Sequence, residues 1–272
     1  MRHARSLVVA VWAACAGCAG ADAMALPPTA SAKPSAPAGE IGLNPGENMA
    51  FEVRLAGIMA GEAQLAVGEL GDYEGHRAVV VKSRAATAGV GALLRHIVDE
   101  ATTVIDMETG RPLAVDTLVE QGDKTTTATA KFTNNVAEIT YIRSGENAPH
   151  KQKIDLGKVT VHDAHSAMAQ LRGWRATPGT MRSVFVVGGR RLWRVDVTYV
   201  GEDTIGSAIG NRRAVHFTGG SYHTKRNLDA ETAKPARTFS VWLSDDADRV
   251  PLKVTASTEL GDIVMDLTEY NR

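Results

Sequence analysis

Cysteine is nearly absent from this chain. The 272 residues include two cysteines, Cys15 and Cys18, and both lie close to the N-terminus. The rest of the chain therefore has neither a disulfide bond nor thiol chemistry. A domain of this length tolerates that even in an oxidising compartment, because its hydrophobic core is large enough to be stable without cross-links.

Aromatic residues and net charge are also scarce. Aromatics make up 5% of the chain, and the formal net charge is -1. Few aromatics argue against an aromatic-lined sugar groove but leave an aliphatic pocket open. A near-neutral chain has no overall attraction to nucleic acid or anionic lipid, so we predict no nucleic-acid partner.

Catalytic motifs are missing as well. The chain has no Gly-x-Ser-x-Gly nucleophile elbow, no phosphate-binding loop and no dinucleotide fingerprint. Asp99 and Glu100 are neighbours on an expected strand, so their side chains point to opposite faces and a shared hydrolytic site is not expected. We predict that the protein is not an enzyme and uses no cofactor.

A targeting segment is expected at the N-terminus. A short basic region precedes an apolar run over 6–16 that is too short to span a bilayer. Cleavage after Ala21-Asp22-Ala23 would give a signal peptide over 1–23. Ala16-Gly17-Cys18 instead resembles a lipoprotein site at which Cys18 is lipidated, although Cys15 replaces the usual Leu. Both alternatives predict a periplasmic protein or one held at the bacterial envelope by an N-terminal lipid, its only expected contact with a membrane.

The next segment, 24–44, is rich in Pro, Ala and Ser. It has too few apolar residues to pack, so we predict a disordered tether. A ragged exported N-terminus is the simpler alternative. The remaining residues, 45–272, show no repeat, no alternation of strands with helices and no long linker, and we expect a single domain.

The domain is expected to be mainly β. In the stretch 237–267, Phe239, Val241 and Leu243 alternate with polar residues, and a polar turn and Pro251 follow. Similar short alternating runs recur along the chain with turn signals between them, which indicates an antiparallel meander of about a dozen strands. Because large sheets twist, we predict a curved sheet, either a half-barrel or a barrel-like fold.

One helix is expected, over 164–172. Ala164, Ala167, Met168 and Leu171 follow a helical spacing. Asp163 is a suitable N-cap, and the glycine after Arg172 is a suitable stop. We predict that this helix packs against the sheet.

Several short motifs together resemble a known family. They are Gly46-Glu47 before Phe51, the hairpin from Gly57 to Gly61, Asp99 to Asp106 followed by Gly110-Arg111-Pro112-Leu113, Asp163 to Arg172, and Val241-Trp242-Leu243-Ser244-Asp245-Asp246 with Arg249-Val250-Pro251-Leu252. The chain resembles, over roughly 46–267, the bacterial exported family known as domain of unknown function 3108. The resemblance implies a β-rich envelope protein without an established activity, and it supplies no catalytic residues.

Two clusters deserve comparison with metal sites. His162 and His165 could converge on one ion with a third ligand, but a solvated helix end is the simpler interpretation. The run Ser244, Asp245, Asp246 and Asp248 offers oxygen ligands, but it lacks the glycine and distal glutamate of a calcium loop. Turn chemistry explains that run better.

The concave face of the expected sheet is the candidate binding site. We predict that it binds a lipid or another apolar molecule, with the lining residues Leu93, Leu94, Met168, Leu171 and Trp193. A basic hairpin tip formed by Arg190, Arg191 and Arg194 could attract anionic lipid heads. The alternative is a structural or protein-interaction module of the periplasm whose core is filled by its own side chains.

Overall fold

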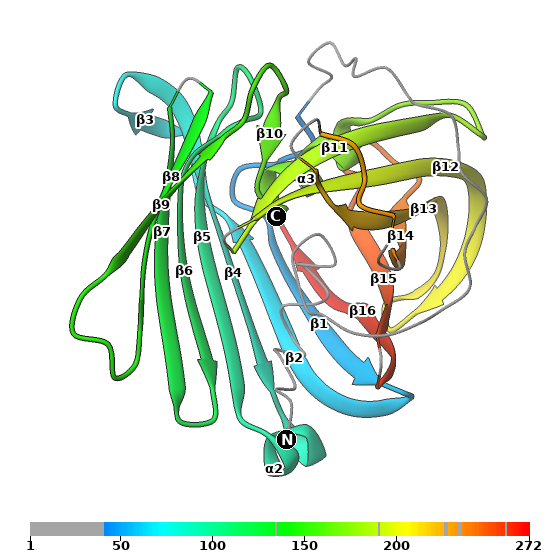
Figure 1. Ribbon diagram of the computed structural model, residues 1–272. Coiled ribbons are helices and arrows are strands. Elements are labelled where there is room, and N and C mark those ends of the chain that lie inside the picture. Colours follow the sequence, from blue (N-terminus) through cyan, green and yellow to red (C-terminus); the bar gives the residue numbers. More distant parts are fainter. Residues whose placement is uncertain (1–40, 134, 190, 226–227, 233–235, 259) are drawn as a thin grey trace.

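The structure is a computed structural model that describes residues 41–272 except 134, 190, 226–227, 233–235 and 259. Sixteen strands form one continuous sheet, and two short helices lie beside it within the described part of the chain (Figure 1). The predicted mainly β fold is confirmed. The predicted signal peptide over 1–23, its alternative lipidation site Cys18 and most of the tether lie outside the described residues.

The N-terminal half of the chain forms a curved wing that faces the rest of the molecule (Figure 1). Its strands are β1 (Asn48–Leu55), β2 (Ile58–Val67), β3 (Gly71–Tyr73), β4 (His76–Thr87), β5 (Ile97–Asp106), β6 (Pro112–Gln121), β7 (Lys124–Thr133), β8 (Val136–Arg143) and β9 (His150–Asp155). Helix α2 (Gly89–Leu94) connects β4 to β5 at the lower end of the wing.

The C-terminal half curls into a barrel-like unit. Its elements are β10 (Val161–His162), α3 (Ala164–Gly173), β11 (Met181–Gly188), β12 (Arg191–Ser207), β13 (Gly210–His223), β14 (Arg237–Ser244), β15 (Pro251–Thr258) and β16 (Gly261–Asn271). The strand order is β10-β11-β12-β13-β14-β15-β16-β1-β2-β4-β5-β6-β7-β8-β9, with β3 paired to β4. The pairs are antiparallel except the short β10–β11 pair, which is parallel.

The sheet does not close into a barrel, because β9 and β10 remain at the two ends of the strand order. The two ends nevertheless contact each other. Phe185 and Val187 of β11 lie in one buried cluster with Ala137 and Ile139 of β8. The alternate residue Val186 belongs instead to the main core. Strand β11 therefore buries both faces, and the sheet rolls up like a spiral.

The main core fills the barrel-like unit. Alternate residues of β14, β15 and β16 point into it, as the period-two pattern predicted. Leu243, Met265 and Leu267 are completely covered. This part of the concave face is therefore occupied by the protein's own side chains.

Helix α3 confirms the helix predicted over 164–172. The Asp163 side chain caps it by accepting hydrogen bonds from the backbone N–H groups of His165 and Ser166. In return, the Ser166 hydroxyl oxygen accepts a hydrogen bond from the backbone N–H of Asp163, which completes a capping box. The helix lies inside the concavity between the wing and the barrel-like unit (Figure 1). None of the described helices has the length and hydropathy that crossing a bilayer requires.

Strand β13 continues to His223, and Thr224 forms a bridge with Ala230. One boundary differs from expectation. The expected tether over 24–44 ends earlier, because Leu43 is buried in the main core and Gly42 N–H bonds to the Ala169 carbonyl. The two apolar residues at the end of this segment, Ile41 and Leu43, are enough to dock it against the main core.

Candidate functional site

A buried ion pair joins Glu47, the residue before β1, to Arg172 at the end of α3. Arg172 is 2% exposed and Glu47 is fully buried. The Arg172 guanidinium holds the Glu47 carboxylate with two parallel hydrogen bonds, one of them 2.8 Å long. Asn44 adds a side-chain bond of 3.3 Å to the same carboxylate. Such a bidentate pair fixes the orientation of both side chains.

The turn between β14 and β15 is built by side chains that bond to the backbone. One carboxylate oxygen of Asp246 accepts bonds from the N–H groups of Asp248 (3.1 Å) and Arg249 (3.0 Å) and from the Ser244 hydroxyl (2.7 Å). The Ser244 hydroxyl accepts from Val250 N–H at 2.8 Å. These bonds hold Arg249 at a φ of 49°, a region that costs free energy for a residue with a side chain.

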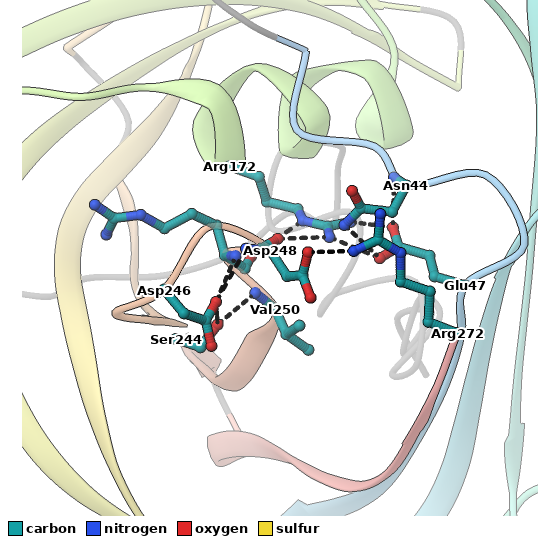
Figure 2. Close-up of polar contacts among 9 residues, drawn as sticks. Asn44, Glu47, Arg172, Ser244, Asp246, Asp248, Val250 and Arg272 are labelled. Carbon is teal, nitrogen blue, oxygen red and sulfur yellow. Dashed lines mark hydrogen bonds and ion pairs between the residues drawn. The ribbon is translucent and has the colours of Figure 1, made fainter.

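Arg172 also locks this turn. Its Nε donates to the Arg249 carbonyl at 3.1 Å, and Nη2 donates to the Asp248 carbonyl at 2.9 Å (Figure 2). One guanidinium therefore ties α3, the entry to β1 and the β14–β15 turn together. We call Glu47, Arg172 and this turn the arginine clasp.

Most of the motifs that suggested the family converge on the arginine clasp, whereas the hairpin from Gly57 to Gly61 lies at the opposite end of β1. The clasp itself is made by Glu47, by Arg172 in the last turn of α3 and by the Ser-Asp-Asp turn. The turn after β5 lies next to it, since Met107 and Glu108 line a cavity of about 560 Å³ together with Arg172, Arg175 and Asp248. Local sequence explains the turn, but only the fold shows why the motifs occur together.

Close packing around the clasp explains one glycine. A Cβ atom at Gly42 would overlap the Cβ and backbone of Arg172. The N-terminal segment can therefore approach α3 only where a side chain is absent. This contact brings Ile41 and Asn44 to the wall of the cavity.

The carboxylates that resembled a calcium site are used inside the protein. Asp246 bonds the turn, Asp245 pairs with Arg213 at 2.8 Å, and Asp248 pairs with Arg272 at 2.7 Å. Turn chemistry, the preferred interpretation of the sequence, accounts for these contacts. Across the described ranges, no group of three or more His, Cys, Asp or Glu side chains is placed to hold a metal ion.

A second polar network anchors the start of α3 to the sheet. Thr103 Oγ1 donates to Asp163 at 2.6 Å, so its oxygen can accept a bond from Nδ1 of His165 at 2.8 Å. Nε2 of His165 then accepts from the Ser83 hydroxyl at 2.8 Å. This tautomer follows from the partners. Burial lowers the pKa of His165, which favours the neutral ring that the network requires.

The Ser83–His165 pair has the polarity of a nucleophile and a base, but its surroundings do not support catalysis. His165 is 3% exposed. Ser83 lies in mid-strand between paired neighbours in β2 and β5, where backbone N–H groups are used by the sheet and cannot stabilise an oxyanion. We interpret the network as the attachment of α3 to the wing.

The weak metal candidates are both buried. The two ring nitrogens of His165 are engaged by Thr103 and Ser83. Nδ1 of His162 lies 3.3 Å from the Ser166 hydroxyl, and burial lowers the pKa of His162 to about 4. His162 and His165 therefore belong to the helix attachment and are not a solvated helix end.

The five predicted ligand-lining residues lie on three different elements. Leu93 is 87% exposed on α2, and the placement of the Leu94 side chain lies outside the described part. Met168 and Leu171 pack from α3 against the main core. Trp193 is 3% exposed on β12, where its ring lies 4.1 Å from that of His223. The structure does not show these residues gathered around one space.

The predicted basic hairpin tip is divided between two faces of the sheet. Arg191 shares a face with the buried Trp193, whereas Arg194 points to the other face and pairs with Asp196 at 2.8 Å. Arg190 lies outside the described residues. A different arginine, Arg237, covers the Trp193 ring at 5.4 Å.

The inner face of the wing is only partly covered. Below α3 it presents a row of small side chains that face each other across four strands: Ser83, Ala101, Thr117 and Ala128. All of them are half-buried, in contrast to the closed inner face of the barrel-like unit. Two of the four side chains carry hydroxyl groups, and these bond within the protein to His165 and to the Ala128 carbonyl. Sequence reasoning missed the row because Ala and Thr give no strong signal.

Asp99 lies on the same inner face, beside this row. Its Oδ2 is buried without a hydrogen-bond partner in the described structure. Burial, and to a smaller extent the charge of Glu100, raise the pKa of Asp99 to about 7. A carboxyl group of this kind is neutral or half-ionised near neutral pH.

The fold identifies the chain as a rolled β-sheet protein that encloses a capped helix. It belongs to the DUF3108 family of proteins of unknown function, whose model matches residues 50–268. The resemblance noted in the sequence is confirmed. No curated protein matches the chain.

Solved structures with a similar fold are also known. A β-barrel-like protein of the DUF1849 family from Brucella abortus is similar over 83% of this chain and 96% of its own, with 11% identity and a TM-score of 0.56. A Bacteroides fragilis protein described as exported, with a YmcC-like fold, covers 86% of this chain and 100% of its own at 7% identity and a TM-score of 0.39. A Parabacteroides distasonis protein described as a lipoprotein covers 84% and 96% at 8% identity and a TM-score of 0.34. At these identities the likeness to the Brucella protein shows the fold alone.

Proposed function

We propose that the protein is an exported, non-catalytic protein of the bacterial envelope that binds a lipid or another apolar ligand on the inner face of the wing. The observation that carries this proposal is the half-buried row from Ser83 to Ala128, on the same sheet whose other half is closed. The hydroxyl groups of Ser83 and Thr117 bond within the protein, so the row presents mainly methyl and methylene groups, and apolar surface that a protein leaves uncovered commonly marks a binding site.

The shape of this surface favours an extended ligand. Small side chains leave room along the row, and strands about 5 Å apart set a regular spacing across it. Tyr141 lies opposite Ala128 on β8 and continues the row towards the edge of the wing. An acyl chain laid across the strands would cover this surface without needing hydrogen bonds.

The N-terminal segment supports the location. A basic region, an apolar run and a Pro-, Ala- and Ser-rich stretch precede the domain, as in exported proteins. Cleavage before Cys18 would leave a lipid anchor, whereas cleavage after Ala23 would release the domain into the periplasm. Either form would place the wing where lipids are available.

A second candidate function has its own supporting observation. The barrel-like unit is filled by its own core, and two hollows of about 490 and 560 Å³ are lined largely by polar side chains. These features favour a structural or protein-interaction module without a lipid cargo. The inner face of the wing would then meet a protein.

Native mass spectrometry separates the two candidates. The protein is exported in a bacterial host, purified without detergent and measured before and after incubation with dispersed envelope lipids. A bound lipid mass supports the proposed function and identifies the ligand class. A bare protein mass in both samples contradicts it and favours the interaction module.

A further inference from the structure

One carboxyl group on the inner face of the wing has an oxygen without a partner. Asp99 lies on β5 with its side chain on the same face as Thr103, whose hydroxyl bonds to the cap of α3. The Oδ2 atom of Asp99 is buried, and no donor within the described part of the chain bonds to it. Buried polar atoms in folded proteins are nearly always hydrogen-bonded, so this exception calls for an explanation.

The surroundings of Asp99 are apolar. Ala85 of β4 and Val119 of β6 lie directly opposite it in the sheet. Ile97 and Ala101 are its neighbours on the same face of β5. None of these four side chains can donate a hydrogen bond. The nearest positions of the sheet therefore supply no donor to the carboxyl group.

A compensating cation is also missing among the described residues. Burial and the like charge of Glu100 raise the pKa of Asp99, and no opposite charge acts on it. Glu100 itself points to the other face, where Arg84 pairs with it at 3.1 Å. His165 bonds to the same inner face, but burial lowers its pKa and favours its neutral form. The ionised form of Asp99 is therefore left without a partner charge.

Asp99 nevertheless remains within reach of a ligand. The residue is half-buried, so part of it stays open. It lies two positions from Ala101, about 7 Å along β5, and Ala101 belongs to the row from Ser83 to Ala128. A ligand that covers the row therefore passes beside this carboxyl group.

The carboxyl group of Asp99 does not serve the stability of the fold at neutral pH. The native carboxyl binds its proton more tightly than the unfolded one, so ionisation as the pH rises through about 7 costs stability. A group that costs stability on a partly open face is typical of a binding site.

We propose that Asp99 anchors the ammonium group of an amphiphilic ligand whose apolar chain lies on the row from Ser83 to Ala128. An ammonium group supplies the missing hydrogen bond and the missing positive charge together, and such charge-assisted bonds are the strong ones. A hydroxyl group would supply the bond alone, and an anionic head would meet a like charge. The anchor rests on the proposed function, because the row supplies the apolar part of the site. It narrows the ligand class to molecules that join an apolar chain to an amino group.

Isothermal titration calorimetry at about pH 8 tests the anchor, because the Asp99 carboxyl is then mostly ionised and alkyl amines are protonated. The probes are decylamine, decanoate and dihexanoylphosphatidylethanolamine, each below its micelle concentration. The variant is Asp99→Asn, which removes the charge and keeps the shape. Asp116→Asn is the matched control, since Asp116 is an exposed aspartate on the outer face of β6.

We expect the wild type and the control to bind decylamine more tightly than decanoate. Asp99→Asn should weaken decylamine binding by about tenfold or more, as for the loss of a charge-assisted hydrogen bond, and should not weaken decanoate binding. Binding of the phospholipid probe would assign the ammonium group to an ethanolamine headgroup, whereas binding of decylamine alone would assign it to a simple long-chain amine.

Two results overturn the anchor: equal affinity of the wild type for decylamine and decanoate, or decylamine binding that Asp99→Asn leaves unchanged. Both would leave an apolar site on the row standing, whereas binding of neither decyl probe would contradict the proposed function as well. Thermal melting checks the variant, which should be at least as stable as the wild type at this pH. Should Asp99→Asn fail to fold, the comparison of decylamine with decanoate in the wild type decides.

Discussion

Replacing Arg172 with Met should destabilise the protein strongly. The substitution leaves the fully buried Glu47 carboxylate without its cation and removes the donors to the carbonyls of Asp248 and Arg249. Breaking a buried ion pair by removing one partner costs about 3–5 kcal/mol. We expect a loss of free energy of unfolding in this range, a large part of the stability of an ordinary domain.

Urea denaturation followed by tryptophan fluorescence measures this loss. Trp174 follows the helix directly and stacks on Phe217 of the main core at 5.5 Å, so it reports on the packing of α3. The midpoint should fall while the slope of the transition stays constant, provided the native state remains compact. Exposed ion pairs contribute little to stability, and the exposed pair of Arg84 with Glu100 serves as the reference. Arg84→Met should lower the free energy of unfolding by less than about 1 kcal/mol.

A double variant distinguishes the ion pair from simple packing. Glu47→Leu together with Arg172→Met removes both charges. The double variant should therefore lose much less free energy of unfolding than the sum of the losses in the two single variants. A loss below about 1 kcal/mol for Arg172→Met would refute the reasoning, because it would mean that the buried carboxylate needs no partner. Strict additivity in the double variant would also contradict a direct interaction between Glu47 and Arg172.

Three further predictions follow from other contacts. Thr103→Val should lower the free energy of unfolding by about 1–3 kcal/mol, because Asp163 and His165 lose their shared hydroxyl; no change in the urea midpoint would contradict this. Asp99→Asn should become more stabilising as the pH rises from about 4 to about 7, by at least about 1 kcal/mol in total, because the native carboxyl binds its proton more tightly than the unfolded one and that stabilisation is lost across this range. A difference between variant and wild type that stays flat with pH would show that this pKa is not raised. Gly42→Ala should lower the melting temperature because a Cβ would overlap Arg172, whereas Gly71→Ala, where the Cβ meets open space, should not; equal shifts would argue against the close contact.

The strands and the helix could be predicted because their signals are local. Alternation in 237–244 and 251–258 marks half-buried strands, and Asp163 with its helical apolar spacing marks the start of α3. The long hairpin of β12 and β13 was harder to predict. Its outer part, 200–213, is largely exposed and lacks the alternation on which the prediction depends.

The contacts that make the sites could not be predicted from spacing. Glu47 and Arg172 lie 125 positions apart in sequence, and Thr103 and His165 lie 62 apart. Charged and hydroxyl residues are expected on the surface, so nothing in the sequence marks these as buried. The predicted ligand residues lie where the plain alternation of the strands is interrupted, but a large apolar side chain such as Trp193 is used by packing. The partly open surface consists of small residues.

The most direct test of the central claim places one charge on each face of β7. Ala128→Arg puts a cation on the inner face of the wing, and Thr127→Arg puts the same cation on the outer face one residue away, where Thr127 is exposed. Native mass spectrometry then measures lipid bound to each variant after export and detergent-free purification. We expect Ala128→Arg to lose the bound lipid and Thr127→Arg to retain it as the wild type does. Equal lipid occupancy in both variants, or no lipid in the wild type, would contradict a ligand site on the inner face of the wing.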